Sequence, residues 1–241
     1  MQSFSVASDQ PVVVLGGFLI TDEAYLPLAS WIESRCAAPV RIVHATRADW
    51  LLTSQARGWI RLLDRVDRCV KQLASSSSSG RVTLIGHSSG GVMLRPYLSD
   101  RPFLHRRYGG KALCNRLITL GSPHQAKRAT ALRMLVDQTF PGCPEASSVD
   151  YVAVAGELDL SGPCASWFSR ITASNSYRQI AGDASVPGDG LVPVTSALLA
   201  DARSVRLKDT AHGGLFGSPW YGSAQTIPTW WSAVVEGASH R

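Results

Sequence analysis

The chain has 241 residues, of which 45% are hydrophobic and 17% are charged, and its formal net charge is +6. This composition excludes an intrinsically disordered protein and predicts one globular domain over residues 1–241. The apolar runs are far shorter than the ~20 residues of a membrane span, and the first ten residues carry no secretory signal.

The net charge and the cysteine content indicate which classes of partner and which cellular compartment to expect. Five widely spaced cysteines without a C-x-x-C pair predict reduced thiols, a cytoplasmic protein and no zinc site. The basic surface allows weak association with an anionic membrane surface. Four arginines on the expected helix 54–73 have no interleaved aromatic residues, so they read as a solvated helix face and no nucleic-acid partner is expected. The oligomeric state is left open.

Strands and helices are predicted to alternate along the chain. The apolar run 11–20 predicts a first strand that ends in two glycines, and Thr21 or Asp22 can cap a helix that continues to about Cys36. Further strands are expected at 40–45, 82–85, 116–120, 151–155, 177–181 and 204–207. Further helices are expected at 54–73, after residue 88, at 128–138 and at 223–236. The alternation predicts an α/β fold, a mostly parallel central sheet with helices on both faces.

The segments between these elements are expected to be irregular. Residues 48–52 and 101–111 read as connections, and 125–150 and 160–175 as short excursions from the single domain. Pro96 should kink or end the helix after residue 88 early, because it removes a backbone donor.

A G-x-S-x-G pentapeptide, Gly86-His-Ser88-Ser-Gly90, stands between an apolar β-branched run and an apolar helical pattern. This context predicts a sharp strand-to-helix turn that presents Ser88 at the end of the strand. A serine hydroxyl becomes a nucleophile only beside a base, which a third group orients. The turn therefore predicts an acid and then a histidine further along the chain.

His212 is the preferred base, because it lies in a loop after the last strand and before the final helix. His124 comes before any plausible acid and is interpreted as a residue that either supports the catalytic residues from behind or lines the substrate pocket. Asp189 is the preferred acid, because its Gly-Asp-Gly context is typical of a tight turn that exposes a carboxylate. Asp159, which follows the strand at 151–155, stays open as the alternative. A turn aspartate bonded to its own backbone is the structural interpretation of Asp189.

Acyl transfer also needs backbone N–H donors for the developing oxyanion. Ser89, directly after Ser88, is expected to give one of them, and Phe18 the other, with Gly17 allowing close approach of the backbone. Gly17 and Leu19 are expected to border the substrate, because 18–20 would form an apolar wall beside Ser88. A plain strand-ending turn is the structural interpretation of the two glycines.

These segments together resemble the α/β-hydrolase superfamily, in its lipase and esterase branch, and in particular the lipase-like hydrolases of cyanobacteria and chloroplasts. The resemblance covers nearly the whole chain and rests on Gly86 to Gly91, Gly16-Gly17-Phe18, the Leu-Gly-Ser-Pro-His sequence at 120–124, the Gly-Asp-Gly-Leu-Val-Pro sequence at 188–193 and His212. It implies a serine hydrolase with Ser88 as nucleophile, His212 as base and Asp189 as acid, without metal or cofactor. Two features depart from the pattern: Gly16 stands where many lipases have histidine, and Pro96 lies in the helix behind the nucleophile.

The expected reaction is cleavage of a carboxylic ester through an acyl-serine intermediate. The apolar wall and the short excursions favour an uncharged small-molecule ester or lipid with an apolar acyl chain, and Trp167 and Phe168 could face it, although such pairs usually pack in a core. An acyltransferase or a thioesterase on the same residues is the alternative. A non-catalytic binding protein is the alternative of another class, and the retained serine, acid and histidine argue against it.

Overall fold

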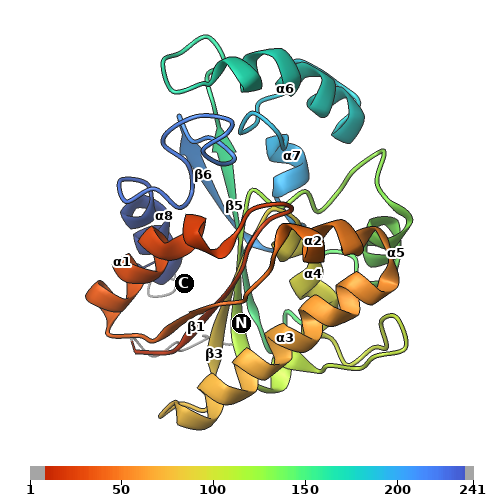
Figure 1. The fold of residues 1–241 in the computed structure, drawn as a ribbon, viewed down its shortest axis with the longest axis vertical. Helices are drawn as coiled ribbons and strands as arrows, with labels where there is room; N and C mark the ends of the chain where they lie inside the picture. Colours follow the sequence, from red (N-terminus) through yellow and green to blue (C-terminus); the bar gives the residue numbers. More distant parts are fainter. Residues whose placement is uncertain (1–8, 237–241) are drawn as a thin grey trace.

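A six-stranded sheet forms the centre of the computed structural model, which describes residues 9–236 (Figure 1). Its strands are β1 (Val12–Leu15), β2 (Val40–Ile42), β3 (Val82–His87), β4 (Cys114–Leu120), β5 (Asp150–Glu157) and β6 (Arg203–Lys208). Their order is β2-β1-β3-β4-β5-β6, and each neighbouring pair is parallel. The expected parallel sheet is confirmed, and its carboxyl ends gather the loops that follow β1, β3, β4, β5 and β6.

Helices cover both faces of this sheet, as predicted. They are α1 (Leu26–Cys36), α2 (Arg47–Leu51), α3 (Ala56–Ser76), α4 (Ser89–Leu98), α5 (Ala131–Thr139), α6 (Trp167–Ile180), α7 (Val194–Ala197) and α8 (Ile227–Glu236). Short 3₁₀ turns occupy Asp22–Tyr25, Leu52–Ser54 and Gly110–Ala112. Figure 1 shows α6 at the top of the view, beyond the sheet, and α7 below it beside β5. Ser88 lies between the carboxyl end of β3 and the first residue of α4.

The strand β1 shows why a parallel strand reads as a continuous apolar run. Its four residues are all buried, and successive side chains point to opposite faces of the sheet. Val13 and Leu15 belong to the core that includes α3 and α4, whereas Val12 and Val14 belong to the core that includes α1 and α8. The sheet therefore holds two apolar layers, one on each side.

Two expectations about secondary structure are wrong. Residues 177–181, expected as a strand, form the last turn of α6, because Ser169, Ala173 and Tyr177 recur at helical spacing on its buried face. Residues 48–52, expected as an irregular connection, lie mostly in α2. That helix begins with a capping box in which Thr46 and Asp49 bond each other's backbone N–H.

Other expectations agree with the structure. The helix α4 ends at Leu98, two residues after Pro96, which fits the expected early end. All five cysteines are unpaired. Among residues 9–236 no helix is long and apolar enough to cross a membrane. Most of the N-terminal segment without a signal pattern, residues 1–8, lies outside the described residues.

Candidate active site

Ser88 occupies the sharp turn between β3 and α4. Its backbone has φ 52° and ψ −124°, a conformation that is costly for a residue with a side chain and that persists where the surroundings enforce it. Gly86 and Gly90 make the turn possible: a Cβ on Gly86 would lie 2.4 Å from the Gly91 Cα, and one on Gly90 would lie 2.3 Å from the Leu15 oxygen. The turn therefore has the strand-to-helix geometry that the motif predicts.

The structure brings three of the predicted residues together in a hydrogen-bonded relay. His212 Nε2 lies 2.9 Å from Ser88 Oγ, and His212 Nδ1 lies 2.8 Å from Asp189 Oδ2. The three side chains come from the end of β3, the turn before α7 and the loop after β6, and all are buried. In this arrangement Nδ1–H donates to the carboxylate, and Nε2 is free to accept the serine proton.

Asp189 uses its two carboxylate oxygens for different purposes. Oδ1 accepts the backbone N–H groups of Leu191 and Val192 at 3.1 and 2.8 Å, which stabilise the turn. Oδ2 faces His212, whose backbone N–H also donates to the Asp189 carbonyl oxygen at 2.8 Å. The contacts of Oδ1 agree with the turn interpretation, and the contact of Oδ2 supports the assignment of Asp189 as the acid, which stays a prediction. Asp159 is exposed and accepts hydrogen bonds from Ser161 instead.

Tyr221 is a further partner of Asp189 that sequence reasoning missed. Its hydroxyl donates to Asp189 Oδ2 at 2.8 Å and accepts the Gly156 N–H at 2.7 Å. Burial, together with the neighbouring Asp189 charge, raises the pKa of Tyr221 well above its usual value, so the hydroxyl stays a donor. Tyr221 stands in no recognisable motif before the last helix, and no signal in one sequence could have found it.

The two expected oxyanion donors belong to segments next to Ser88: Ser89 follows it in the chain, and Phe18 follows Gly17, which packs against the Ser88 side chain. Residues 17–20 form a turn in which the Ile20 N–H donates to the Gly17 oxygen at 3.1 Å, and Leu19 has a positive φ of 62°. Within residues 9–236, the backbone N–H groups of Phe18 and Ser89 donate to no protein group. A Cβ on Gly17 would lie 2.9 Å from the Ser88 Cβ, so this glycine permits the close approach.

The first departure from the lipase pattern also has a structural reason. A Cβ on Gly16 would lie 2.6 Å from the Tyr25 ring. Tyr25 thus fills the space that a side chain at position 16 would need, and its hydroxyl supports the Gly17 N–H at 2.8 Å.

Apolar side chains surround the relay. The Phe216 ring packs edge-on against the His212 ring at 5.6 Å, and Phe168 packs on Phe216 at 5.5 Å. Of the pair expected at the pocket, Phe168 therefore points toward the site, whereas Trp167 is 72% exposed. Phe18, Leu19 and Leu215 are exposed apolar residues in the loops that hold Gly17 and His212. We call these three residues the apolar border.

His124 does not join the relay. It is buried, and its Nε2 lies 3.1 Å from Thr119 Oγ1 on β4. Burial, with smaller effects of Arg95 and Arg133, lowers the pKa of His124 well below its usual value, so the ring is neutral. Its expected contact with substrate stays a prediction.

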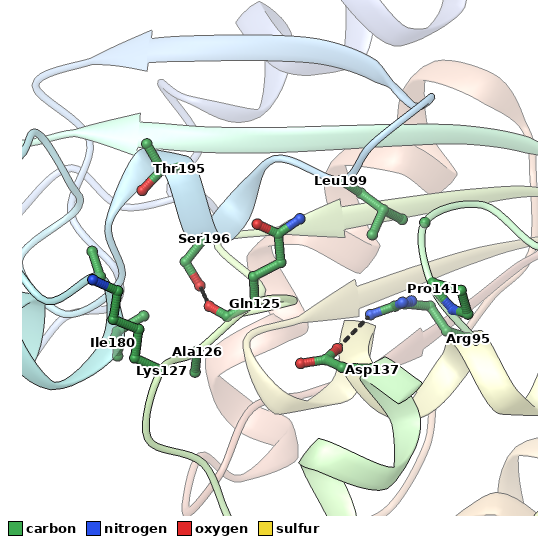
Figure 2. Close-up of a pocket in the computed structure, with 12 residues that line it drawn as sticks. Arg95, Gln125, Ala126, Lys127, Asp137, Pro141, Ile180, Thr195, Ser196 and Leu199 are labelled. Carbon is green, nitrogen blue, oxygen red and sulfur yellow. Dashed lines mark hydrogen bonds and ion pairs between the residues drawn. The ribbon is translucent and has the colours of Figure 1, made fainter. Parts of the chain in front are cut away.

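A cavity of about 470 Å³ lies apart from the relay, beside α5 and α7 (Figure 2). Its lining includes Arg95 and Asp137, whose side chains are 3.3 Å apart, but not Ser88, Asp189 or His212. The Arg95 and Asp137 charges pair with each other, and Lys127 is a third charged residue of the lining.

The parallel sheet, the strained turn at Ser88 and the histidine beside it place the protein in the α/β-hydrolase superfamily, in its lipase and esterase branch. More narrowly, the chain belongs to the palmitoyl protein thioesterase family, whose model matches residues 11–179. The chain is therefore a serine hydrolase of the kind that cleaves esters or thioesters.

Solved structures share the fold at low sequence identity. The mature lipase BlEst2 of Bacillus licheniformis is 14% identical, with 94% of this chain and 92% of that chain covered and a TM-score of 0.64. The product of gene lin2722 of Listeria innocua is 15% identical, with 94% of each chain covered and a TM-score of 0.54. A comparison with curated proteins finds no match.

Proposed function

We propose that the protein hydrolyses a carboxylic ester with an apolar acyl group, through an acyl-serine intermediate. Ser88 is the nucleophile, His212 the general base and acid, and Asp189 the group that orients His212. The observation that carries this proposal is the relay from Ser88 Oγ to His212 at 2.9 Å and from His212 to Asp189 at 2.8 Å.

The reaction follows from these positions. Ser88 Oγ attacks the acyl carbon while His212 Nε2 takes its proton, and the Asp189 carboxylate stabilises the resulting imidazolium. The C–O bond of the tetrahedral intermediate then breaks, and His212 returns the proton to the leaving alcohol. In the second half, His212 takes a proton from water, which attacks the acyl-serine, and the acid is released as Ser88 recovers its proton.

Charge on the acyl oxygen is stabilised by the backbone N–H groups of Phe18 and Ser89. Their freedom from protein acceptors and their positions beside Ser88 support this assignment. Such donors need no reorganisation when charge develops, and removal of one typically costs ~10²- to 10³-fold in rate.

Two observations bear on the substrate. The border formed by Phe18, Leu19 and Leu215, together with the Phe216 ring against His212, favours an apolar acyl chain. Membership of the palmitoyl protein thioesterase family favours a second candidate, a thioester with a long acyl chain. Both candidates use the same relay and differ only in the leaving group.

The assignment of the nucleophile is tested with Ser88→Ala. The variant should lose labelling by a fluorophosphonate probe, and its kcat toward p-nitrophenyl esters should fall by ~10³-fold or more, because no hydroxyl remains to be acylated. Circular dichroism should show an unchanged fold. Labelling or turnover that survives the substitution would contradict the proposal.

A paired substrate series separates the two candidates. An oxygen ester and a thioester with the same acyl chain, each at several chain lengths, are compared by kcat/KM. A higher value for the oxygen ester supports the carboxylic-ester assignment, and a higher value for the thioester supports the second candidate. Product partition between water and an added alcohol shows whether acyl transfer competes with hydrolysis.

A further inference from the structure

A buried chain of hydrogen bonds passes beneath the nucleophile and joins two loops of the site. The Gly17 N–H donates to Tyr25 Oη at 2.8 Å, and Tyr25 Oη lies 2.8 Å from His87 Nδ1. On the other side of the same ring, His87 Nε2 lies 2.8 Å from the His212 carbonyl oxygen. The chain thus begins in the turn that presents the Phe18 N–H and ends on the backbone of the proposed base.

The direction of each hydrogen bond in this chain is determined. A backbone N–H can only donate and a backbone carbonyl can only accept, so Gly17 donates to Tyr25 and His87 Nε2–H donates to His212. Burial keeps the His87 ring neutral, so its one proton is the Nε2–H that donates to His212. Nδ1 then has a free lone pair, and the Tyr25 hydroxyl donates to it.

Burial maintains this state. His87 has no exposed surface, and burial followed by the proximity of His212 lowers the pKa of His87 well below its usual value. Burial likewise raises the pKa of Tyr25 above its usual value, so its hydroxyl remains a donor. A proton that arrives on His212 during turnover therefore does not pass to His87, and the direction of the chain is preserved.

The packing leaves little freedom at either end. The rings of His87 and His212 have centroids 4.9 Å apart, and the position of a Cβ on Gly17 would be 3.0 Å from His87 Nδ1. His87 also directly precedes Ser88 on the strained turn. A movement of the His87 ring would thus displace Ser88, His212 and the turn at residues 17–20 together. We call that turn, which presents the Phe18 N–H, the oxyanion turn.

We propose that Tyr25 and His87 are positioning residues: they fix the position of the oxyanion turn relative to the base, His212, and to Ser88. This inference rests on the proposed function of that site. Neither side chain contacts the reacting atoms. The two residues fix the distance between the Phe18 N–H, which donates a hydrogen bond to the developing oxyanion, and His212, which takes the serine proton. The donor and the base are needed in the same transition state.

Tyr25→Phe tests this role, since it removes only the hydroxyl that joins Gly17 to His87. We expect kcat to fall by ~10- to 100-fold, because small displacements of aligned groups cost rates of this order. KM should stay within about twofold, because substrate binding in the ground state does not use the oxyanion donors. The fluorophosphonate labelling rate should fall in parallel, because phosphonylation of Ser88 uses the same turn.

Tyr97→Phe is the matched control. Tyr97 is also fully buried, and its hydroxyl reaches Asp67, but neither residue contacts the site. Its kcat should remain within about twofold of the wild-type value. Rates are referred to the folded fraction at the assay temperature, measured by near-ultraviolet circular dichroism, so a loss that only follows the folded fraction overturns the proposal.

A double-mutant cycle provides the second test. His87→Gln removes the Nδ1 acceptor of the Tyr25 hydroxyl, which is the link that Tyr25→Phe also breaks, and it removes the Nε2–H that donates to His212 as well. The double variant should be no slower than the slower single variant within about twofold, because one link cannot be lost twice. Losses that multiply, or an unchanged kcat for Tyr25→Phe, overturn the proposal. If Ser88→Ala abolishes activity in the same assay, such a result leaves the proposed function intact.

Discussion

Asp189 shows how much of the site is decided by single atoms. One carboxylate oxygen stabilises its own turn, and the other is shared by His212 and Tyr221. The Tyr221 hydroxyl supplies a second donor to Oδ2, in addition to His212. It therefore helps to determine which lone pair His212 meets and how basic that oxygen is.

Removal of this hydroxyl in Tyr221→Phe is expected to lower kcat about 10-fold, because Oδ2 loses a donor that orients it toward His212. The Gly156 N–H also loses its acceptor, at a cost of about 1–3 kcal/mol in the free energy of unfolding. Steady-state kinetics and urea unfolding measure the two effects. Unchanged kcat in a destabilised variant would show that Tyr221 is only structural.

At the scale of single residues, the sequence predicts those features of the site that depend only on neighbours in the chain. Ser88 and Ser89 can be proposed from the sequence because the turn needs glycines at fixed spacing, and Asp189 because Gly-Asp-Gly is typical of a tight turn. Tyr25 and Tyr221 are not found, because each hydroxyl meets its partner only after distant segments have packed together. The residues next to a tyrosine in the sequence do not indicate the atom to which its hydroxyl will donate.

Among the elements, α2 links the surface helix α3 to the oxyanion turn. Asp49 on α2 is buried and pairs with Arg65 at 2.8 Å and Arg61 at 3.1 Å, both on α3. The next residue, Trp50, is fully buried and packs edge-on against Phe18 at 6.5 Å. Arg61 and Arg65, two of the four arginines that were expected on a solvated helix face, therefore hold α2 in the position from which Trp50 contacts Phe18.

We expect Asp49→Asn to lower the free energy of unfolding at pH 7 by about 2 kcal/mol, because it leaves the Arg65 guanidinium without its carboxylate. Burial alone would raise the pKa of Asp49, but hydrogen bonds from Arg65 and Thr46 outweigh it and lower the pKa to about 2. Because the folded-state pKa is below the unfolded one, this stabilisation is present above about pH 4 and is lost as the pH falls toward 2.

Urea unfolding of both proteins between pH 2 and 7 measures this difference, which should shrink as the pH falls. Glu157→Gln serves as the control, because its pairing with Arg206 is more exposed and longer, at 3.5 Å. It should change the free energy of unfolding by less than about 0.5 kcal/mol. A deficit of Asp49→Asn that stays constant down to pH 2 would exclude the carboxylate as its cause.

The elements that the sequence predicts correctly are those whose burial is uniform. β1 and β3 are buried on both faces, so each reads as an unbroken apolar run. The end of α6 is misread because the residues around Tyr177 are too few to distinguish a short strand from one helical turn. The helix α2 is short, and its Thr-x-x-Asp capping box was the signal that could have identified it.

At the scale of the whole molecule, the buried neutral histidines His87 and His124 link stability to pH. The folded-state pKa values of His87 and His124 both lie well below the ordinary value of 6.5. Below about pH 6.5 the unfolded chain therefore binds more protons than the folded protein. The contribution of these two histidines to the free energy of unfolding is fully present above that pH. It decreases as the pH falls, by up to about 1.4 kcal/mol per pH unit for each histidine.

Substitution of one of these rings should reduce that dependence. In His124→Gln, the slope of unfolding free energy against pH between 6.5 and 5 should be smaller than in the wild type by about 1.4 kcal/mol per pH unit. Thr119→Val removes the hydroxyl at 3.1 Å from His124 but keeps the ring, so it should lower stability without a smaller slope. Equal slopes in His124→Gln and wild type would contradict the assignment of a neutral ring.

The order of the strands has a consequence for how the protein is made. Ser88 follows a central strand, whereas His212 follows β6, the edge strand, and the two residues are 124 positions apart in the chain. During synthesis the serine, its turn and both expected oxyanion donors emerge long before the base. On the proposed mechanism, a nascent chain that has not yet added β6 to the sheet has no base beside Ser88 and does not acylate it. The activity that we propose is then acquired only when almost all of the sheet has been assembled.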